Sequence, residues 1–302
     1  MKNLKIYILL LITGLTIYGC DNPAPTQLIQ DSSTQGQVKV EVVTKDTGNV
    51  YYNNGFDTTG VAQQSTNYSN IITVSGTKVT REDETTESAF AQVLFFDTSH
   101  PIKSPMGDTL GFLTMSPGIV MFNGIPALQT PYRIRYNGNG LQIDTLLGQQ
   151  YLLIDNGNVF SRLFFRYNSQ IHFQYIPRKT KPISFDIPTP PEITGKVKLT
   201  GRLSNKNLNA VVQWDKSSST AVELIIGAIT SDSKDTYPLF KLESKDNGSI
   251  TVPSKLLNAI PPKRYDKLVF TLVRKIETNN PEGDSNLHVL SQSIHTIILD
   301  IP

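Results

Sequence analysis

The sequence predicts an all-β protein with two β-sandwich-like domains, which follow an N-terminal signal peptide and a flexible tether. After the first twenty residues, short runs of alternating apolar and polar residues recur along the chain, as in half-buried strands. Thr, Ser and Asn are abundant and only 18% of the residues are charged, a composition typical of exported β-proteins. A proline-rich segment separates the alternating runs into two blocks, which predicts two domains.

Residues 1–19 have the organisation of an export signal peptide. Lys2 and Lys5 give a basic start, and Ile6–Ile12 is an apolar run. This run is shorter than the roughly 20 apolar residues that a membrane-spanning helix needs. Asp21–Pro25 holds no cluster of Lys or Arg that would stop transfer across the membrane. The chain is therefore expected to be exported.

The four residues Ile17-Tyr18-Gly19-Cys20 resemble the lipobox of bacterial lipoproteins. In that family the cysteine thiol receives a diacylglycerol, the signal is cut off before the cysteine, and the new amine is acylated. The resemblance implies cleavage between Gly19 and Cys20, acyl chains such as palmitate on Cys20, and a membrane as the partner of that residue. An ordinary cleaved signal and an uncleaved anchor are the alternatives.

Cys20 is the only cysteine of the chain, so no internal disulfide can form. Lipidation gives this single thiol a role, and stable anchoring takes more than one acyl chain, each buried CH₂ contributing about 0.8 kcal/mol. The expected location is the bacterial cell envelope, facing the periplasm or the exterior, with the outer membrane favoured. Asp21 would favour the inner membrane under the sorting rule of some enteric bacteria.

The charge balance argues against nucleic acid as a partner. The chain carries 28 Lys and Arg against 26 Asp and Glu, and without Lys2 and Lys5 the balance is 26 against 26. Nucleic-acid binding needs a dense basic surface. The one locally basic group, Arg178-Lys179-Thr180-Lys181, is interpreted as a solvated turn.

Residues 20–36 are rich in Pro, Gln, Ser and Thr and predict the flexible tether, and residues 37–186 predict an N-terminal all-β domain. Tyr132–Tyr136 and Leu141–Asp144 flank Asn137-Gly138-Asn139-Gly140, a strong β-hairpin signal. The acidic group Glu82–Glu84 with Glu87 is expected to be a solvated loop. The other expected strands are Val38–Val42, Ile71–Val79 (a strand or a hairpin), Ala89–Phe96, Gly118–Phe122, Tyr151–Ile154, Ser161–Tyr167 and Gln170–Ile176.

A loop rich in Asn and Thr, Thr47–Ser69, is the best candidate for a binding site. Tyr51, Tyr52, Phe56 and Tyr68 fall within it, and exposed aromatic rings on a β-scaffold loop could stack on sugar rings or on a protein partner. Core packing and a disordered loop remain the alternatives for these four side chains.

The proline-rich segment, residues 187–191, is the predicted boundary between the domains, because its prolines stiffen the chain and cannot donate backbone hydrogen bonds. Residues 192–302 then have the length of one β-sandwich. Its expected strands are Gly195–Leu199, Ala210–Trp214, Ala221–Ile229, Tyr237–Leu242, Ser249–Val252, Lys267–Lys275 and Ser293–Ile301.

Ala210–Trp214 followed by Val222–Ile226 resembles the B and C strands of fibronectin type III or immunoglobulin-like domains, which implies that Trp214 points into a core. Asn247–Pro261 is similar to a stretch in sandwich modules of uncharacterised exported bacterial proteins, where a strand leads into a short helix and a proline stop. Ser254 is expected to cap that helix, with Leu256 and Leu257 closing one end of the sandwich. These resemblances imply a fold and carry no catalytic motif.

No catalytic residue, metal site or cofactor is predicted. The histidines His100, His172, His288 and His295 lack the spacing of metal ligands, and His172 and His295 are expected on solvent-facing strand positions. Asp97-Thr98-Ser99-His100-Pro101 gathers an acid, hydroxyls and an imidazole. Neighbouring side chains on one turn rarely converge as nucleophilic catalysis requires, so this segment is interpreted as a turn.

Two sets of carboxylates are candidates for other chemistry. A glycosidase needs two carboxylates at a fixed separation, and Asp144, Asp155 and Asp186 occupy strand ends or turns, where Asp is ordinary. A calcium site needs clustered oxygens, for which the candidates are Asp232, Asp235 and Asp246, without the D-x-D-x-D-G pattern.

The sequence therefore predicts a lipid-anchored envelope protein that is not an enzyme and that serves in binding or assembly. Its partner would be an envelope protein or a polysaccharide. Two alternatives stay open: an exported hydrolase or carbohydrate-active protein with an accessory β-sandwich, and a surface adhesin.

Overall fold

The computed structural model describes residues 39–42, 50–52, 70–103, 107, 109–138, 141–155, 165–178, 180–217, 221–231, 236–279 and 287–302. Gln37–Pro302 forms one compact unit, distinct from Met1–Gly36. The predicted signal peptide, its cleavage site, Cys20 and the tether lie outside the described residues. Within the described ranges, no helix is long and apolar enough to span a bilayer.

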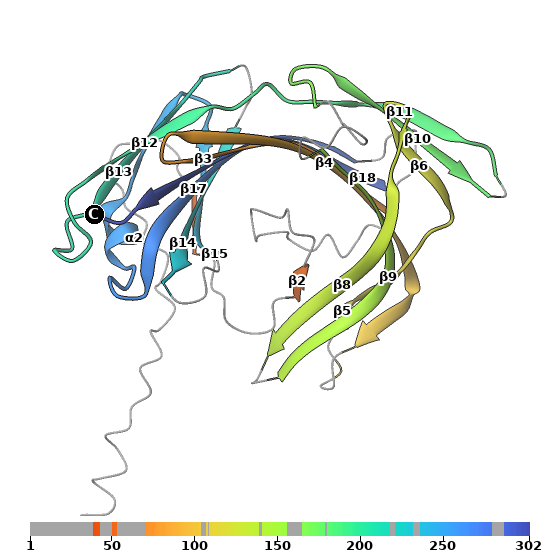
Figure 1. Cartoon of the computed structure of the whole chain (residues 1–302), viewed down its shortest axis with the longest axis horizontal. Helices are drawn as coiled ribbons and strands as arrows, with labels where there is room; N and C mark the ends of the chain where they lie inside the picture. The colour runs from red at the N-terminus through yellow and green to blue at the C-terminus, as the bar shows by residue number, and fades with distance from the viewer. Residues whose placement is uncertain are drawn as a thin grey trace, which may run out of the picture. The chain divides into compact units, whose positions relative to one another are not determined.

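An eleven-stranded sheet runs through the compact unit and confirms the all-β prediction (Figure 1). The strands, in the order in which they pair, are β1 (Lys39–Val42), β15 (Thr236–Lys245), β14 (Ala221–Thr230), β17 (Tyr265–Asn279), β18 (Leu287–Asp300), β3 (Asn70–Arg81), β4 (Glu84–Lys103), β5 (Thr109–Met115), β9 (Leu141–Asp155), β8 (Leu128–Gly138) and β2 (Val50–Tyr52).

Two smaller sheets and one short helix complete the described part of the fold. The four-stranded sheet has the order β11 (Ile183–Pro188), β10 (Gln170–Pro177), β6 (Gly118–Phe122) and β7 (Ile125–Pro126). The three-stranded sheet has the order β12 (Gly195–Thr200), β13 (Asn209–Trp214) and β16 (Ser249–Val252). The helix α2 (Ser254–Asn258) follows β16.

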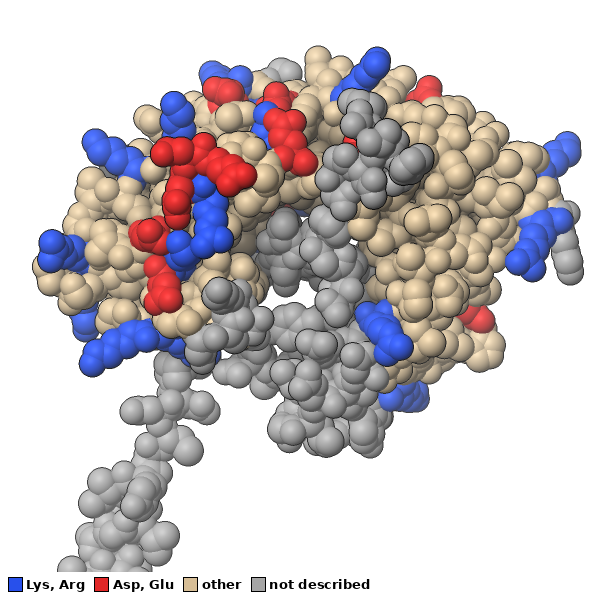
Figure 2. Space-filling view, in the orientation of Figure 1, with Lys and Arg blue, Asp and Glu red and all other residues tan. Residues whose placement is uncertain are grey.

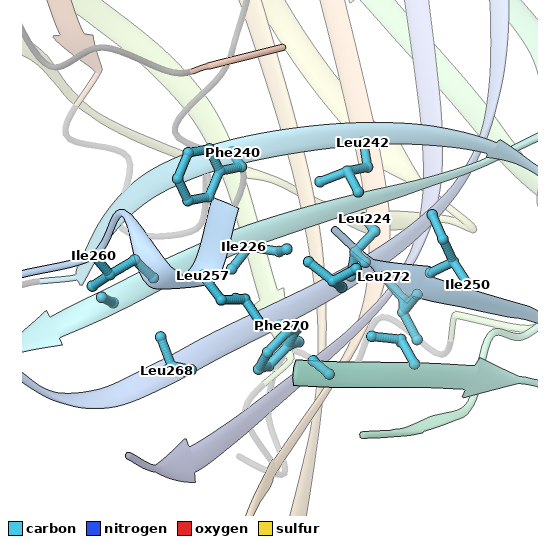
Figure 3. Close-up of a cluster of buried hydrophobic side chains, with 14 of the residues drawn as sticks. Leu224, Ile226, Phe240, Leu242, Ile250, Leu257, Ile260, Leu268, Phe270 and Leu272 are labelled. Atoms are coloured by element: carbon cyan, nitrogen blue, oxygen red, sulfur yellow. The ribbon is translucent and has the colours of Figure 1, made fainter. Parts of the chain in front are cut away.

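Each small sheet covers its own part of the large sheet with a hydrophobic core between them. One core joins Ile72, Val93 and Tyr151 of the large sheet to Phe122 and Phe173 of the four-stranded sheet. The other core packs β14, β15 and β17 against the three-stranded sheet and α2, as the labelled side chains of Figure 3 show. Burying each such Leu, Ile or Phe stabilises the fold by roughly 1.5–3 kcal/mol. The unit is thus two β-sandwiches that share one sheet.

The two sandwiches meet where β18 pairs with β3 in parallel, from Leu287↔Asn70 to Ile298↔Arg81. Strand β1 precedes the first sandwich in the chain, but it pairs with β15 of the second sandwich, at one edge of the large sheet. The proline-rich segment 187–191 therefore lies inside a compact unit whose main sheet continues on both sides of it.

Most of the expected strands are confirmed. The hairpin pairs β8 with β9 down to Gly138↔Leu141, and Ile71–Val79 belongs to one strand rather than a hairpin. All seven expected strands after residue 192 are present, six of them longer than predicted. Trp214 and Leu257 are buried in the second core, as predicted, and Leu256 packs against it.

Four expectations about local structure are wrong. Only Glu82 and Asp83 form a turn, whereas Glu84 and Glu87 belong to β4, since strand pairing extends almost to the turn. Phe165–Tyr167 is not a strand. Ser254 is the first residue of α2 rather than its cap, which is Pro253 with no side-chain hydrogen bond. The segment 187–191 is not a free linker, because Ile187 and Pro188 end β11.

Candidate functional sites

A buried ion pair lies in the second sandwich, between Asp246 after β15 and Arg274 on β17. The Nε of Arg274 donates to Asp246 Oδ2 over 2.9 Å, and its second terminal nitrogen donates to Oδ1 over 3.0 Å. Trp214 Nε1 also donates to Oδ1, over 2.8 Å. Burial opposes ionisation of the Asp246 carboxyl, but the hydrogen bonds from Arg274 and Trp214 outweigh it and lower its pKa.

The same guanidinium also donates to the backbone carbonyls of Glu192 and Asp215. Arg274 therefore joins the segment before β12, the end of β13 and the loop after β15. Asp246 is committed to this ion pair, so the calcium alternative is wrong for it, and Asp232 and Asp235 lie outside the described residues. Sequence reasoning missed Arg274, although it continues the inward alternation of Leu268, Phe270 and Leu272 on β17.

A second polar cluster surrounds His295 on β18. The sequence predicted a solvent-facing position for this residue, but it is buried. The Gly195 N–H donates to its Nδ1 over 2.8 Å, so the neutral ring carries its proton on Nε2. Nε2 lies 2.9 Å from Thr80 Oγ1 on β3 and can donate to it. Burial lowers the pKa of His295, nearby Lys78 lowers it further, and Glu192 acts in the opposite direction.

Lys78 bridges two carboxylates beside His295. Its Nζ lies 2.5 Å from Glu192 Oε1 and 3.0 Å from Glu87 Oε1, and the hydrogen bond with Glu192 is the largest cause of its raised pKa. Tyr167 lies nearby, and burial raises its pKa to about 12. A Cβ on Gly76 would lie 2.8 Å from the Tyr167 hydroxyl, so only glycine admits this close approach. Lys78 and His295 lie on β3 and β18, the paired strands at which the two sandwiches meet.

The Asp97-Ser99-His100 group does converge, against the prediction. Ser99 Oγ donates to Asp97 Oδ1 over 2.5 Å, and His100 Nδ1 lies 2.6 Å from Asp97 Oδ2 and 2.9 Å from Ser99 Oγ. In a Ser-His-Asp triad the acid and the serine contact different ring nitrogens, which lets the ring move a proton between them. Here both contact Nδ1, which does not fit a triad. The segment lies at a register shift within β4 and is not the predicted turn, because strand pairing continues on both sides of it.

Of the remaining carboxylates and histidines considered in the sequence, His172 and Asp186 form a pair at the surface. His172 is solvent-exposed as predicted, and its Nδ1 contacts Asp186 Oδ1 over 2.8 Å on the outer face of the four-stranded sheet. Asp155 ends β9, whereas Asp144 lies within it rather than at a turn. In the part of the chain that the structure describes, no group of three or more His, Cys, Asp or Glu could hold a metal.

Large exposed apolar side chains gather in the first sandwich, between residues 113 and 183. Met115 pairs in register with Phe95, whose ring lies 4.9 Å from that of Tyr175, and Tyr175 pairs with Ile183. Met115 is 45% exposed and Ile183 is 44% exposed. We call Met115, Phe95, Tyr175 and Ile183 the apolar row, and it runs from the large sheet to the four-stranded sheet.

The predicted binding loop is described only in part. Val50–Tyr52 forms β2 and pairs with β8, with Tyr51 opposite Arg135. The side chains of Tyr51 and Tyr52, and all of Phe56 and Tyr68, lie outside what the structure describes. The binding role of these four residues stays a prediction.

Comparison with known proteins adds no assignment. No protein-family model, curated protein sequence or solved structure matches this chain.

Replacing Arg274 with Ala is expected to destabilise the protein by about 3–5 kcal/mol, because it leaves Asp246 buried without its partner. Replacing both residues, as Arg274→Met with Asp246→Leu, should recover most of that loss, since neither charge is then buried. Urea denaturation followed by the fluorescence of Trp214, the only tryptophan, measures both variants. A double variant no more stable than Arg274→Ala would contradict this account.

Stability should fall as the pH drops below about 6.5, the ordinary pKa of histidine. The pKa of His295 is lowered in the folded state, so the unfolded chain binds more protons in this range and acid favours unfolding. Added at Nδ1, the proton would oppose the Gly195 N–H and the charge of Lys78. His295→Gln should reduce the slope of the unfolding free energy against pH between about 5 and 7.

The matched control is His172→Gln, which removes an exposed imidazole that lies outside this cluster. Some slope should persist in His295→Gln, because burial also lowers the pKa of His288. Equal slopes in His295→Gln and the unsubstituted protein would rule out His295 as the source.

Proposed function

We propose that this protein is a lipid-anchored component of the bacterial cell envelope with a binding or assembly role. The observation that carries the proposal is the order of features along the chain. A basic and apolar start leads to Ile17-Tyr18-Gly19-Cys20, then to a polar segment, and the compact β unit begins only at Gln37. Such an order suits a folded part held near a membrane by its N-terminus.

The surface of the first sandwich supports a binding role. Large apolar side chains that are exposed to solvent favour contact with another molecule. The apolar row is exposed at its two ends, Met115 and Ile183, whereas Phe95 between them is buried in the core and Tyr175 packs against that core. We infer a protein partner of the envelope at this row.

The polar clusters give less support to the hydrolase alternative. The Ser99 hydroxyl and the Asp97 carboxylate share one nitrogen of His100, and the buried Asp246 is held by Arg274. The hydrogen bonds of the Asp97-Ser99-His100 group and of Asp246 are therefore better suited to a structural role than to proton transfer.

Metabolic labelling with a fatty acid tests the anchor. The wild-type protein should incorporate label and sediment with membranes, and Cys20→Ala should lose the label, because the thiol is the acylated atom. Extraction of both strains with and without detergent provides the fractionation control. Label that persists in Cys20→Ala, or that never appears in the wild type, would refute the lipoprotein assignment.

Cross-linking in intact cells tests the binding role. A discrete adduct should form with the wild type and weaken at least severalfold in Ile183→Lys, because a charge in the apolar row opposes burial against a partner. Ile119→Lys is the matched control, since Ile119 is 54% exposed and points to the outer face of the same sheet. An adduct that responds equally to both substitutions would argue against the apolar row.

A further inference from the structure

Two segments of the second sandwich contain no Asp or Glu. They are residues 193–214, which include β12 and β13, and residues 247–265, which include β16 and α2. Together they carry seven cations and no carboxylate. The cations are Lys196, Lys198, Arg202, Lys206, Lys255, Lys263 and Arg264.

The fold brings the two acid-free segments together. Strand β13 pairs with β16, with Val211 opposite Thr251, and the Leu208 N–H donates to Asn258 Oδ1 at the end of α2 over 3.0 Å. Segments separated by more than thirty residues in the chain are therefore neighbours in the fold, and we call their seven cations the basic surface.

The cations of this surface point outward. On β12, Lys196 and Lys198 are exposed and alternate with Val197 and Leu199, which pack against the core. The other five cations, on the turn after β12, on α2 and in the loop after it, are exposed too. Figure 2 shows separate Lys and Arg side chains along the flank that holds β12 and β13 in Figure 1, with the acidic side chains gathered nearer the middle.

Three carboxylates near this surface are already bonded to other groups, whereas Asp215, directly after β13, is exposed. Asp246 is held by Arg274, Asp300 pairs with Lys267 over 2.6 Å, and Asp266 accepts from Ser231. Among the described residues, Lys196, Lys198, Arg202 and Lys206 form no ion pair. The remainder of residues 20–302 holds 19 cations against 26 acids, so a neutral chain is strongly polarised.

We propose that this basic surface docks on the anionic headgroups of the membrane that holds Cys20. This proposal rests on the lipid anchor proposed above. A flexible chain of the length of residues 20–36 has an r.m.s. end-to-end distance of about 20–25 Å. The tether therefore keeps the compact unit close enough to the bilayer for frequent contact, and Lys and Arg are attracted to anionic lipid within about 8–10 Å.

Protection of an edge strand explains only part of this charge. β12 is an edge of its sheet, and lysines on an edge discourage pairing with another chain. That role accounts for Lys196 and Lys198. It does not account for Arg202 and Lys206 in the following turn, or for the absence of carboxylates from both segments.

Vesicle binding tests the proposal on residues 20–302 carrying Cys20→Ser, so that no lipid contributes. The protein should sediment with vesicles of phosphatidylcholine and phosphatidylglycerol at low salt, but not with phosphatidylcholine alone, and high salt should release it. Reversing four charges should weaken binding at least tenfold, and Trp214 fluorescence verifies that the variant is folded. The four changes are Lys196→Glu, Lys198→Glu, Arg202→Glu and Lys206→Glu.

The matched control reverses four exposed cations elsewhere, with the same change in net charge. Compared at about 0.1 M salt, where attraction falls off within about 10 Å, it should bind within about twofold of the unreversed protein. Its changes are Arg81→Glu, Lys103→Glu, Arg178→Glu and Lys181→Glu.

Three outcomes overturn the proposal: no binding to anionic vesicles, equal losses in both variants, or binding to the acidic polysaccharide dextran sulfate without binding to vesicles. The last would assign the surface to an acidic glycan. A failure of fatty-acid labelling at Cys20 would leave the vesicle result standing, so the two proposals fail separately.

Discussion

The buried ion pair between Arg274 and Asp246 is the constraint on which the second sandwich depends. A guanidinium without a partner in a core is strongly destabilising, so every donor of Arg274 has to find an acceptor. Those acceptors belong to segments far apart in the chain: the stretch before β12, the end of β13 and the loop after β15. Trp214 adds its indole N–H to the same carboxylate. One side chain of β17 thereby holds three other segments of the chain in position.

The joint between the two sandwiches obeys the same rule. Strands β3 and β18 pair in parallel there, and His295 and Lys78 project from them toward the segment that connects the two halves in sequence. A neutral imidazole accepts from Gly195, and an ammonium holds Glu192. The large sheet is continuous, and the contacts of His295 and Lys78 reinforce it where the two sandwiches meet. Local unfolding of one sandwich is therefore expected to destabilise the other.

The residues that could carry chemistry are therefore largely absorbed into the structure. Asp246, Arg274 and His295 serve packing, and the Ser99 cluster bonds to a single imidazole nitrogen. What the described part of the chain offers to partners is surface: an apolar row on the first sandwich and an acid-free basic surface on the second. Two surfaces of different chemistry would let an anchored protein face a membrane and a protein at once.

The sequence by itself predicted the all-β class, the hairpin of Tyr132–Tyr136 with Leu141–Asp144, the seven strands after residue 192 and the inward position of Trp214, because alternation and turn residues act over short distances. It also contains Ile17-Tyr18-Gly19-Cys20, the residues on which the proposed lipid anchor rests. Only the tertiary structure decided that β1 pairs with β15, that β3 pairs with β18, and that His295 is buried. A period of two identifies a strand and its two faces, but it does not specify which distant strand lies beside it or which face a second sheet covers. Those choices depend on packing between residues that are remote in the chain.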